Sequence, residues 1–212
     1  MRTPSEYINR TESAMRKLFD GIDSYISIIQ IPPVFGTCYS DQVDFDAKYA
    51  TWAEEHADEI ESAKQANQEY FEESFALAIL CGSALQVAAK AIECYSSNEE
   101  VPQQDFSSMI ATASKTARFC IGREIRGVPL GLIIYAGRNQ HIHFEDAHLR
   151  EPSLSVFKKL AENQFNGITY TDPAFDLTND DLVSFSSNII SLIGWRDFDS
   201  YRNDICKLLS IS

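Results

Sequence analysis

The residue types best suited to chemistry in this chain gather in one polar stretch, residues 137–146, with the sequence GRNQHIHFED. Within it, Arg138, Asn139 and His143 form a pattern that suits attack on a phosphodiester by protein groups alone. An arginine stays charged at any working pH and can hold a phosphate through two parallel hydrogen bonds. A histidine takes or gives a proton near neutral pH. Asn139 lies four residues before His143, on the same helical face, where its amide could orient the imidazole or bind the phosphate.

The spacing of Arg138 and His143 places a geometric condition on this hypothesis. The two residues are five positions apart, which is about 140° around an ideal helix of about 3.6 residues per turn. We therefore expect that a kink near Gly137, the long reach of the arginine, or a second subunit brings them together. The stretch follows a buried apolar run, residues 128–136, and polar groups beside a core are costly to bury unless each finds a partner.

The charge distribution indicates an anionic ligand near the same stretch. The chain has 18 basic and 31 acidic residues, a net charge of -13, whereas residues 115–150 hold six basic residues against three acidic ones. A local positive region on an acidic protein suits one anionic ligand, because a protein that coats nucleic acid broadly is usually basic overall. The alternative for each arginine is an ordinary surface pair with an acidic helix. The further candidates for substrate binding are Arg118, Arg123, Arg126, His141 and Arg150.

The other histidines of the region allow a metal-binding alternative. His141 points to a different helical face from His143, so we expect it to contact a neighbouring helix rather than to act in catalysis. Glu145 and His148 form a Glu-x-x-His pair, the unit of di-iron helical bundles, but the sequence has no second such unit. A metal held by His141, His143 and His148 is the remaining alternative, because three nearby histidines can bind zinc.

The rest of the sequence predicts helices that position these residues. Glycine and proline are sparse, at 9 and 7 residues, and apolar residues recur at three- and four-residue steps. Residues 41–97 are one long helix or two that break near 63–67, and typical helix lengths favour two. An Asn-Gly pair at 166–167 predicts a small hairpin. The predicted helices cover about 5–30, 41–97, 105–122, 129–150, 153–163, 178–194 and 197–209.

These elements predict one all-α domain over residues 1–212, an up-and-down bundle of about six to eight helices. Its core would cover about 70–165, and helices within 178–209 would pack on it as a C-terminal extension. Polar residues interrupt the apolar segment 75–92, which favours a buried core helix over a membrane span. The five scattered cysteines form no CxxC pair, and no secretory signal opens the chain. We expect a cytoplasmic protein with no membrane association and no cofactor.

Residues 138–143, RNQHIH, resemble the Arg-x(4–6)-His signature of the HEPN superfamily of helical bundles. The resemblance implies a homodimer in which two such motifs face each other across a cleft. It also implies metal-independent cleavage of RNA to a 2′,3′-cyclic phosphate, often by a toxin or an antiviral defence protein. In that reaction Arg138 would stabilise the charge on the phosphate, His143 would act as general acid and base, and Asn139 would support both.

Three functions remain open from the sequence. The first is a metal-independent ribonuclease of HEPN type, with RNA as substrate and with a neutralising or regulatory protein as a further partner. The second is a catalytically silent HEPN-like module that binds a nucleotide or a protein, with the acidic segment 41–73 as its interaction surface. The third is a helical metal-binding protein that uses His141, His143 and His148.

Overall fold

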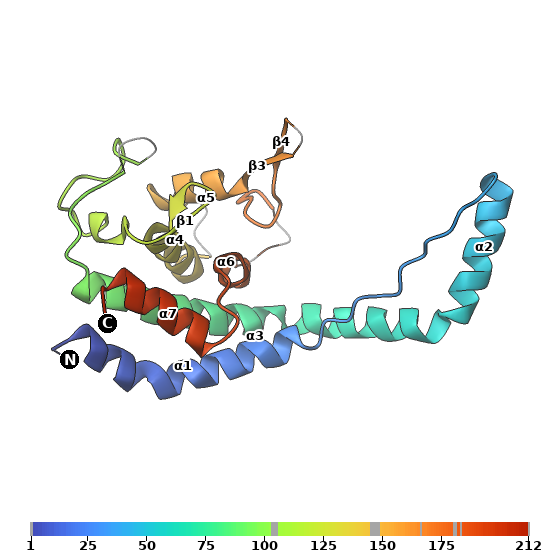
Figure 1. Ribbon diagram of the computed structural model, residues 1–212, viewed down its shortest axis with the longest axis horizontal. Coiled ribbons are helices and arrows are strands. Elements are labelled where there is room, and N and C mark those ends of the chain that lie inside the picture. The colour runs from blue at the N-terminus through green and yellow to red at the C-terminus, as the bar shows by residue number, and fades with distance from the viewer. Residues whose placement is uncertain are drawn as a thin grey trace. The chain divides into compact units, whose positions relative to one another are not determined.

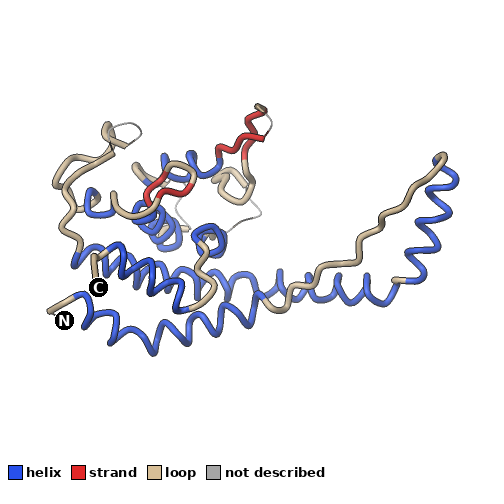
Figure 2. Tube along the Cα trace, in the orientation of Figure 1, coloured by secondary structure: helices blue, strands red, loops and turns tan. Residues whose placement is uncertain are grey.

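The computed structural model describes residues 2–102, 106–144, 149–165, 167–179, 182 and 184–211. Over these residues the fold is mainly helical, with two small antiparallel sheets, which confirms the predicted helical class (Figure 1; Figure 2). The helices are α1 (Pro4–Ile26), α2 (Gln42–Glu55), α3 (Ala57–Tyr95), α4 (Leu130–Ile142), α5 (Ser153–Ala161), α6 (Ser186–Ile193) and α7 (Phe198–Leu208). The short elements are the 3₁₀ helix η1 (Ala117–Phe119) and the strands β1 (Glu124–Ile125), β2 (Val128–Pro129), β3 (Glu162–Phe165) and β4 (Ile168–Thr171).

The chain divides into two compact units, whereas the sequence was interpreted as a single domain. The first unit comprises residues 1–22 and 75–212, and the second comprises residues 23–74. Helices α1 and α3 each contribute to both units. The polar stretch with the candidate chemistry belongs to the first unit.

The core of the first unit surrounds α4. The apolar run predicted to be buried is buried, and Leu132, Ile133 and Ile134 are all inaccessible to solvent. Helix α4 packs against α5 and α6. At Gly137, an added Cβ atom would lie 3.1 Å from Leu85 of α3 and 3.3 Å from Ile189 of α6. The glycine therefore allows both helices to approach α4 closely, which holds its C-terminal turns in place.

The C-terminal helix α7 joins this core through a buried carboxylate. Asp204 accepts hydrogen bonds from the indole Nε1 of Trp195 at 2.9 Å and from Nη2 of Arg123 at 3.0 Å. Asp197 caps the start of α7 by accepting a hydrogen bond from the backbone of Ser200 at 2.7 Å. The predicted helix over 197–209 is thus confirmed, because α7 begins directly after the Asp197 cap and ends at Leu208.

The predicted helix over 105–122 is wrong. The described residues from 106 onward form turns, and only η1 is helical. The end of α3 explains the difference, since Ser96 donates to the carbonyl of Arg118 at 2.8 Å and Asn98 donates to that of Ala117 at 2.7 Å. In a helix these carbonyl groups would accept hydrogen bonds from backbone amides of the same helix. Here they accept from the side chains of Ser96 and Asn98, and polar side chains compete with helix formation in this way.

Other predicted helices also have different bounds, and the one expected over 129–150 ends at Ile142. The segment 41–97 is two helices, but the break lies at His56, whose ring nitrogen Nδ1 lies 2.9 Å from the carbonyl oxygen of Trp52. The helix expected from residue 178 begins only at Ser186. There the backbone amide of Phe185 donates to the Gln140 side chain at 3.0 Å, so a tertiary contact sets the start of α6. The hairpin at 166–167 is confirmed by the pairing of β3 with β4.

Among the described residues, one helix, α3, is long and apolar enough to cross a membrane by length and composition. Buried residues make up 56% of its most apolar window. This arrangement agrees with the interpretation of residues 75–92 as a core helix.

Candidate functional site

Residues 137–142 of the polar stretch form the last turns of α4. His143 is the C-terminal cap of this helix, and its backbone amide donates to the carbonyl oxygen of Asn139 at 3.0 Å. The helix continues through Gly137, so the kink that would have brought Arg138 toward His143 is not seen. Because Tyr135, Asn139 and His143 follow one another at four-residue steps, they lie on one face of α4.

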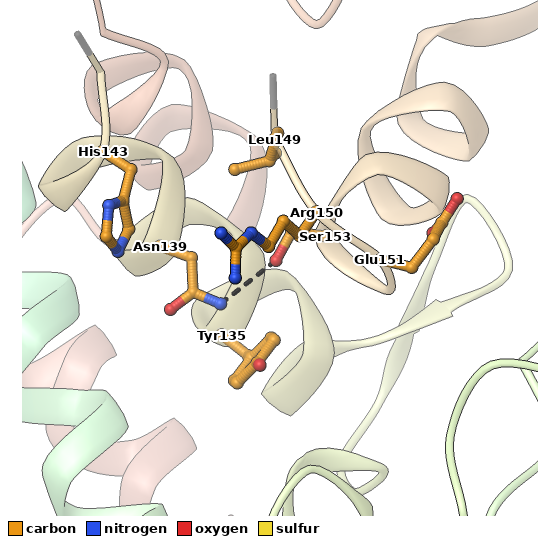
Figure 3. A pocket seen from close by; sticks show the side chains of 7 residues that line it. All are labelled: Tyr135, Asn139, His143, Leu149, Arg150, Glu151 and Ser153. Atoms are coloured by element: carbon orange, nitrogen blue, oxygen red, sulfur yellow. Dashed lines mark hydrogen bonds between the residues drawn. The ribbon is translucent and has the colours of Figure 1, made fainter. Parts of the chain in front are cut away.

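A pocket of about 380 Å³ opens along this face of α4 (Figure 3). Its other wall is the segment that leads into α5 and the first residue of that helix. The amide nitrogen Nδ2 of Asn139 donates to the hydroxyl of Ser153 at 3.1 Å, which joins the two walls. The pocket is lined by Tyr135, Asn139, His143, Leu149, Arg150, Glu151 and Ser153. Three candidate residues from the sequence, Asn139, His143 and Arg150, therefore meet in one place.

Arg150 supplies the positive charge of this pocket. Its guanidinium group points toward Asn139, whereas the side chain of Glu151 points away from it (Figure 3). The carboxylate of Glu151 accepts a hydrogen bond from the backbone amide of Ser155 at 3.1 Å. The pocket thus presents a cation, an imidazole and an amide, which together could hold a phosphate and move a proton.

Arg138 is not among the described residues that line the pocket, but it lies next to Tyr135, which is. Its guanidinium carbon is 5.7 Å from the centroid of the Tyr135 ring. It also lies near Lys90 of α3, whose pKa is raised by a hydrogen bond to Glu93 while the charge of Arg138 acts in the opposite direction. The Nε atom of Arg138 is buried, and no acceptor among the described residues reaches it. A buried donor without an acceptor costs about 1–3 kcal/mol, so an acceptor from a ligand or another molecule would stabilise it.

His141 belongs to the packing of α4 on α3, as its helical position predicted. Its ring lies against Gly82, where an added Cβ atom would be only 2.2 Å from the imidazole. Its Nδ1 atom is 3.4 Å from the hydroxyl of Ser184. Burial lowers the pKa of His141, which favours its neutral form. These contacts give His141 a role in the packing of α4 on α3.

Replacing Gly82 by alanine is expected to lower the free energy of unfolding by about 1–3 kcal/mol, because the new methyl group forces the His141 ring to move. In the double variant Gly82→Ala/His141→Ala the ring is absent, and part of this loss should be recovered. Denaturant unfolding of the wild type, both single variants and the double variant measures the coupling. Additive effects would show that the two residues do not contact each other.

The other candidate arginines make contacts that stabilise the fold, which is the alternative considered for each from the sequence. Arg118 donates to the carbonyl oxygen of Glu93 at 2.8 Å, Arg123 pairs with Asp204, and Arg126 pairs with Asp172 at 2.8 Å. None of the three is among the described residues that line the pocket. Arg118, Arg123 and Arg126 therefore use their charge within the first unit, whereas Arg150 lines the pocket.

The metal-binding alternative required His141, His143 and His148. His141 contacts α3 and His143 lines the pocket, so these two rings have different surroundings. His148 and its neighbour Glu145 lie outside the described residues. Within the part of the chain that is described, no group of three or more histidine, cysteine or acidic side chains could hold a metal ion.

Four lining residues were not predicted as part of a site: Tyr135, Leu149, Glu151 and Ser153. Tyr135 could have been found from its four-residue spacing to Asn139 on the same helix. Ser153 carried no local signal, because its place beside Asn139 depends on how α5 packs on α4. Comparison of the chain with protein-family models, with curated proteins and with solved structures gave no match.

Proposed function

We propose that the protein is a metal-independent endoribonuclease of HEPN type whose active site is the pocket between α4 and α5. The observation that carries the proposal is the meeting of His143, Asn139 and Arg150 in one pocket of about 380 Å³. Pockets of about 300–1,000 Å³ are typical for small ligands, so this volume suits part of a nucleotide. The resemblance of residues 138–143 to the HEPN signature supports the same reaction.

The proposed reaction uses proton transfer and charge stabilisation by side chains. His143 takes the proton of a ribose 2′-hydroxyl, and the 2′-oxygen attacks the adjacent phosphorus. The bond from phosphorus to the 5′-oxygen breaks, which leaves a 2′,3′-cyclic phosphate and a 5′-hydroxyl. The 5′-oxygen then takes that proton back from the His143 imidazolium, so that the histidine acts first as the base and then as the acid. Arg150 and the second N–H group of the Asn139 amide donate to the phosphate oxygens as charge develops.

The net negative charge of the chain is compatible with an RNA substrate because most of it lies outside the first unit. Residues 23–74 contain 12 acidic and 2 basic residues and so carry -10 of the total charge of -13. The first unit, which holds the pocket, is left with a net charge of -3. The repulsion of a polyanion is therefore concentrated in the second unit rather than at the site.

An exposed apolar patch at the end of α4 supports a homodimer. Phe75, Ile79 and Ile142 are 54%, 41% and 52% exposed, and the ring of Phe75 lies 6.3 Å from that of Phe144. This patch is adjacent in sequence to His143, and a two-fold interface would use it twice. A second protomer at this position would bring another motif to the pocket and could offer an acceptor to Nε of Arg138.

Replacing Ile142 by aspartate should convert a dimer into a monomer, because it places a charge in the centre of the proposed interface. Light scattering of the wild type should give about twice the chain mass of 23.9 kDa. The matched control is Ile168→Asp, at a residue 69% exposed on β4, which should leave the mass unchanged. A wild-type protein that is monomeric at every concentration tested would contradict the shared site.

Replacing Arg150 by lysine tests the role of the pocket in the proposed reaction. Lysine keeps the charge but loses the planar fork that holds two phosphate oxygens, so RNA cleavage should fall by about tenfold or more. The matched control is Arg118→Lys, whose exposed side chain donates a hydrogen bond to the backbone carbonyl of Glu93 and does not line the pocket. The measurement is the rate of cleavage of a labelled RNA under single-turnover conditions. Equal rates for the wild type and Arg150→Lys would show that the phosphate is not held in this pocket.

A further inference from the structure

The second unit carries an aromatic cluster that is partly exposed to solvent. Phe45, Tyr49 and Trp52 recur along one face of α2, and Phe35 contacts all three at ring-centroid distances of 5.5, 5.4 and 5.4 Å. His56 stacks on Trp52 at 5.1 Å. Despite these contacts, no residue of α2 is buried. Exposed groups of large aromatic residues are typical of interaction surfaces, since a core would exclude water from them.

Two grooves follow the loop that packs on this cluster. The first has a volume of about 490 Å³ and lies between residues 34–37 and α2, with Trp52 and Glu55 on its helical wall. The second has a volume of about 430 Å³ and is lined by Ile31 of the same loop and by Asp58 and Glu59 of α3. Both grooves combine an apolar surface with carboxylates, Glu55 in the first and Asp58 and Glu59 in the second, and the first groove is also lined by Lys48.

The charges of this unit define what can occupy the grooves. Its only two basic residues are Lys48 and Lys64, against 12 acidic residues. Lys48 is held by Asp44 at 2.8 Å and by the carbonyl oxygen of Cys38 at 2.9 Å, and Lys64 lies 3.7 Å from Glu61. Such a surface repels nucleic acid, and it also repels a second copy of itself. It attracts a basic partner, because complementary charge speeds and selects association.

We propose that these two grooves, residues 30–37 with the facing parts of α2 and α3, bind a basic and partly apolar segment of another protein. Apolar side chains of the segment would lie against Phe35 and Trp52. Its arginines or lysines would pair with Glu55 and Glu59 and stack on the accessible faces of the aromatic rings. The proposal concerns only the second unit and does not depend on the ribonuclease activity.

The test uses the full-length protein and a fluorescent peptide of alternating arginine and leucine, with binding followed by anisotropy. The peptide should bind, and its affinity should fall as salt is added. The double variant Glu55→Lys/Glu59→Lys should weaken binding by about tenfold or more, because it reverses two charges at the grooves. The matched control is Glu69→Lys/Glu73→Lys, which makes the same charge change on exposed residues that line neither groove, and it should weaken binding by less than about threefold.

A second variant tests the shape of the surface without a charge change. Gly36 lines the first groove, and an added Cβ atom would meet nothing within 4 Å, so Gly36→Trp should fill the groove without disturbing the fold. We expect Gly36→Trp to lower the affinity for the peptide by about tenfold, which is typical of losing one important contact residue. The proposal would be overturned if the two double variants weakened peptide binding equally, or if Gly36→Trp bound the peptide as tightly as the wild type. It would also be overturned if oligoarginine without leucine bound as tightly as the arginine-leucine peptide. So would no detectable binding of the arginine-leucine peptide.

Discussion

Replacing His143 by alanine is expected to lower the rate of RNA cleavage by about a hundredfold or more, which is the usual effect of losing a proton-transfer group. His143 is exposed at the end of α4 and lines the pocket. Its removal should therefore leave the free energy of unfolding almost unchanged. The rate should be measured with labelled RNA under single-turnover conditions, together with denaturant unfolding of the same samples.

The matched control for this variant is His141→Ala, two positions away on the other side of the helix. This variant removes a ring that packs against Gly82, so it should alter stability more than cleavage. Replacing His143 should thus lower turnover with little change in stability, whereas replacing His141 should change stability more than turnover. Equal cleavage by the wild type and His143→Ala would mean that His143 is not the acid or base, and the proposed reaction would be wrong.

Mixing two inactive variants is expected to restore RNA cleavage. Arg138→Ala removes a guanidinium that lies beside the pocket rather than in it, and His143→Ala removes the imidazole. If Arg138 of one protomer completes the pocket of the other, a mixed dimer contains one intact site and one doubly altered site. Random exchange of protomers makes about half of the dimers mixed, so roughly a quarter of wild-type activity should return.

The control for the mixing experiment is a mixture of His143→Ala with Asn139→Ala. Both residues line the same pocket of one chain, so every pocket in that mixture lacks one of them and cleavage should stay low. Restored activity in both mixtures would point to a contaminating nuclease. A mixture of Arg138→Ala and His143→Ala that stays inactive after subunit exchange would show that one chain supplies both groups, or that Arg138 acts only in the fold.

The sequence predicted the parts of the site that depend on one helix. Asn139 and His143 share a face because they are four residues apart, and Arg138 does not share it because five residues turn the helix too far. The apolar run before them was predicted to be buried and is buried. Periodicity also located α5 and α7 to within a few residues. These features are set by local geometry, so they can be found without a structure.

The remaining features depend on tertiary contacts that no local pattern reports. Arg150 lies in the pocket only because the chain returns from α4 to start α5 beside it. The expected helix over 105–122 has the right periodicity, but Ser96 and Asn98 take the carbonyl groups that it needed. Residues 41–55 were predicted as part of a helix, whereas the loop that carries Phe35 packs on their aromatic side chains in a separate unit.

The most direct test of the proposed function is the identity of the ends left when the purified protein cleaves RNA in the presence of EDTA. The account predicts cleavage with the chelator present, a 2′,3′-cyclic phosphate on one fragment and a 5′-hydroxyl on the other. RNA with 2′-O-methyl groups, and DNA, should not be cleaved, because the attacking hydroxyl is absent. Complete loss of cleavage in EDTA that zinc or manganese restores, or cleavage of 2′-O-methyl RNA, would contradict it.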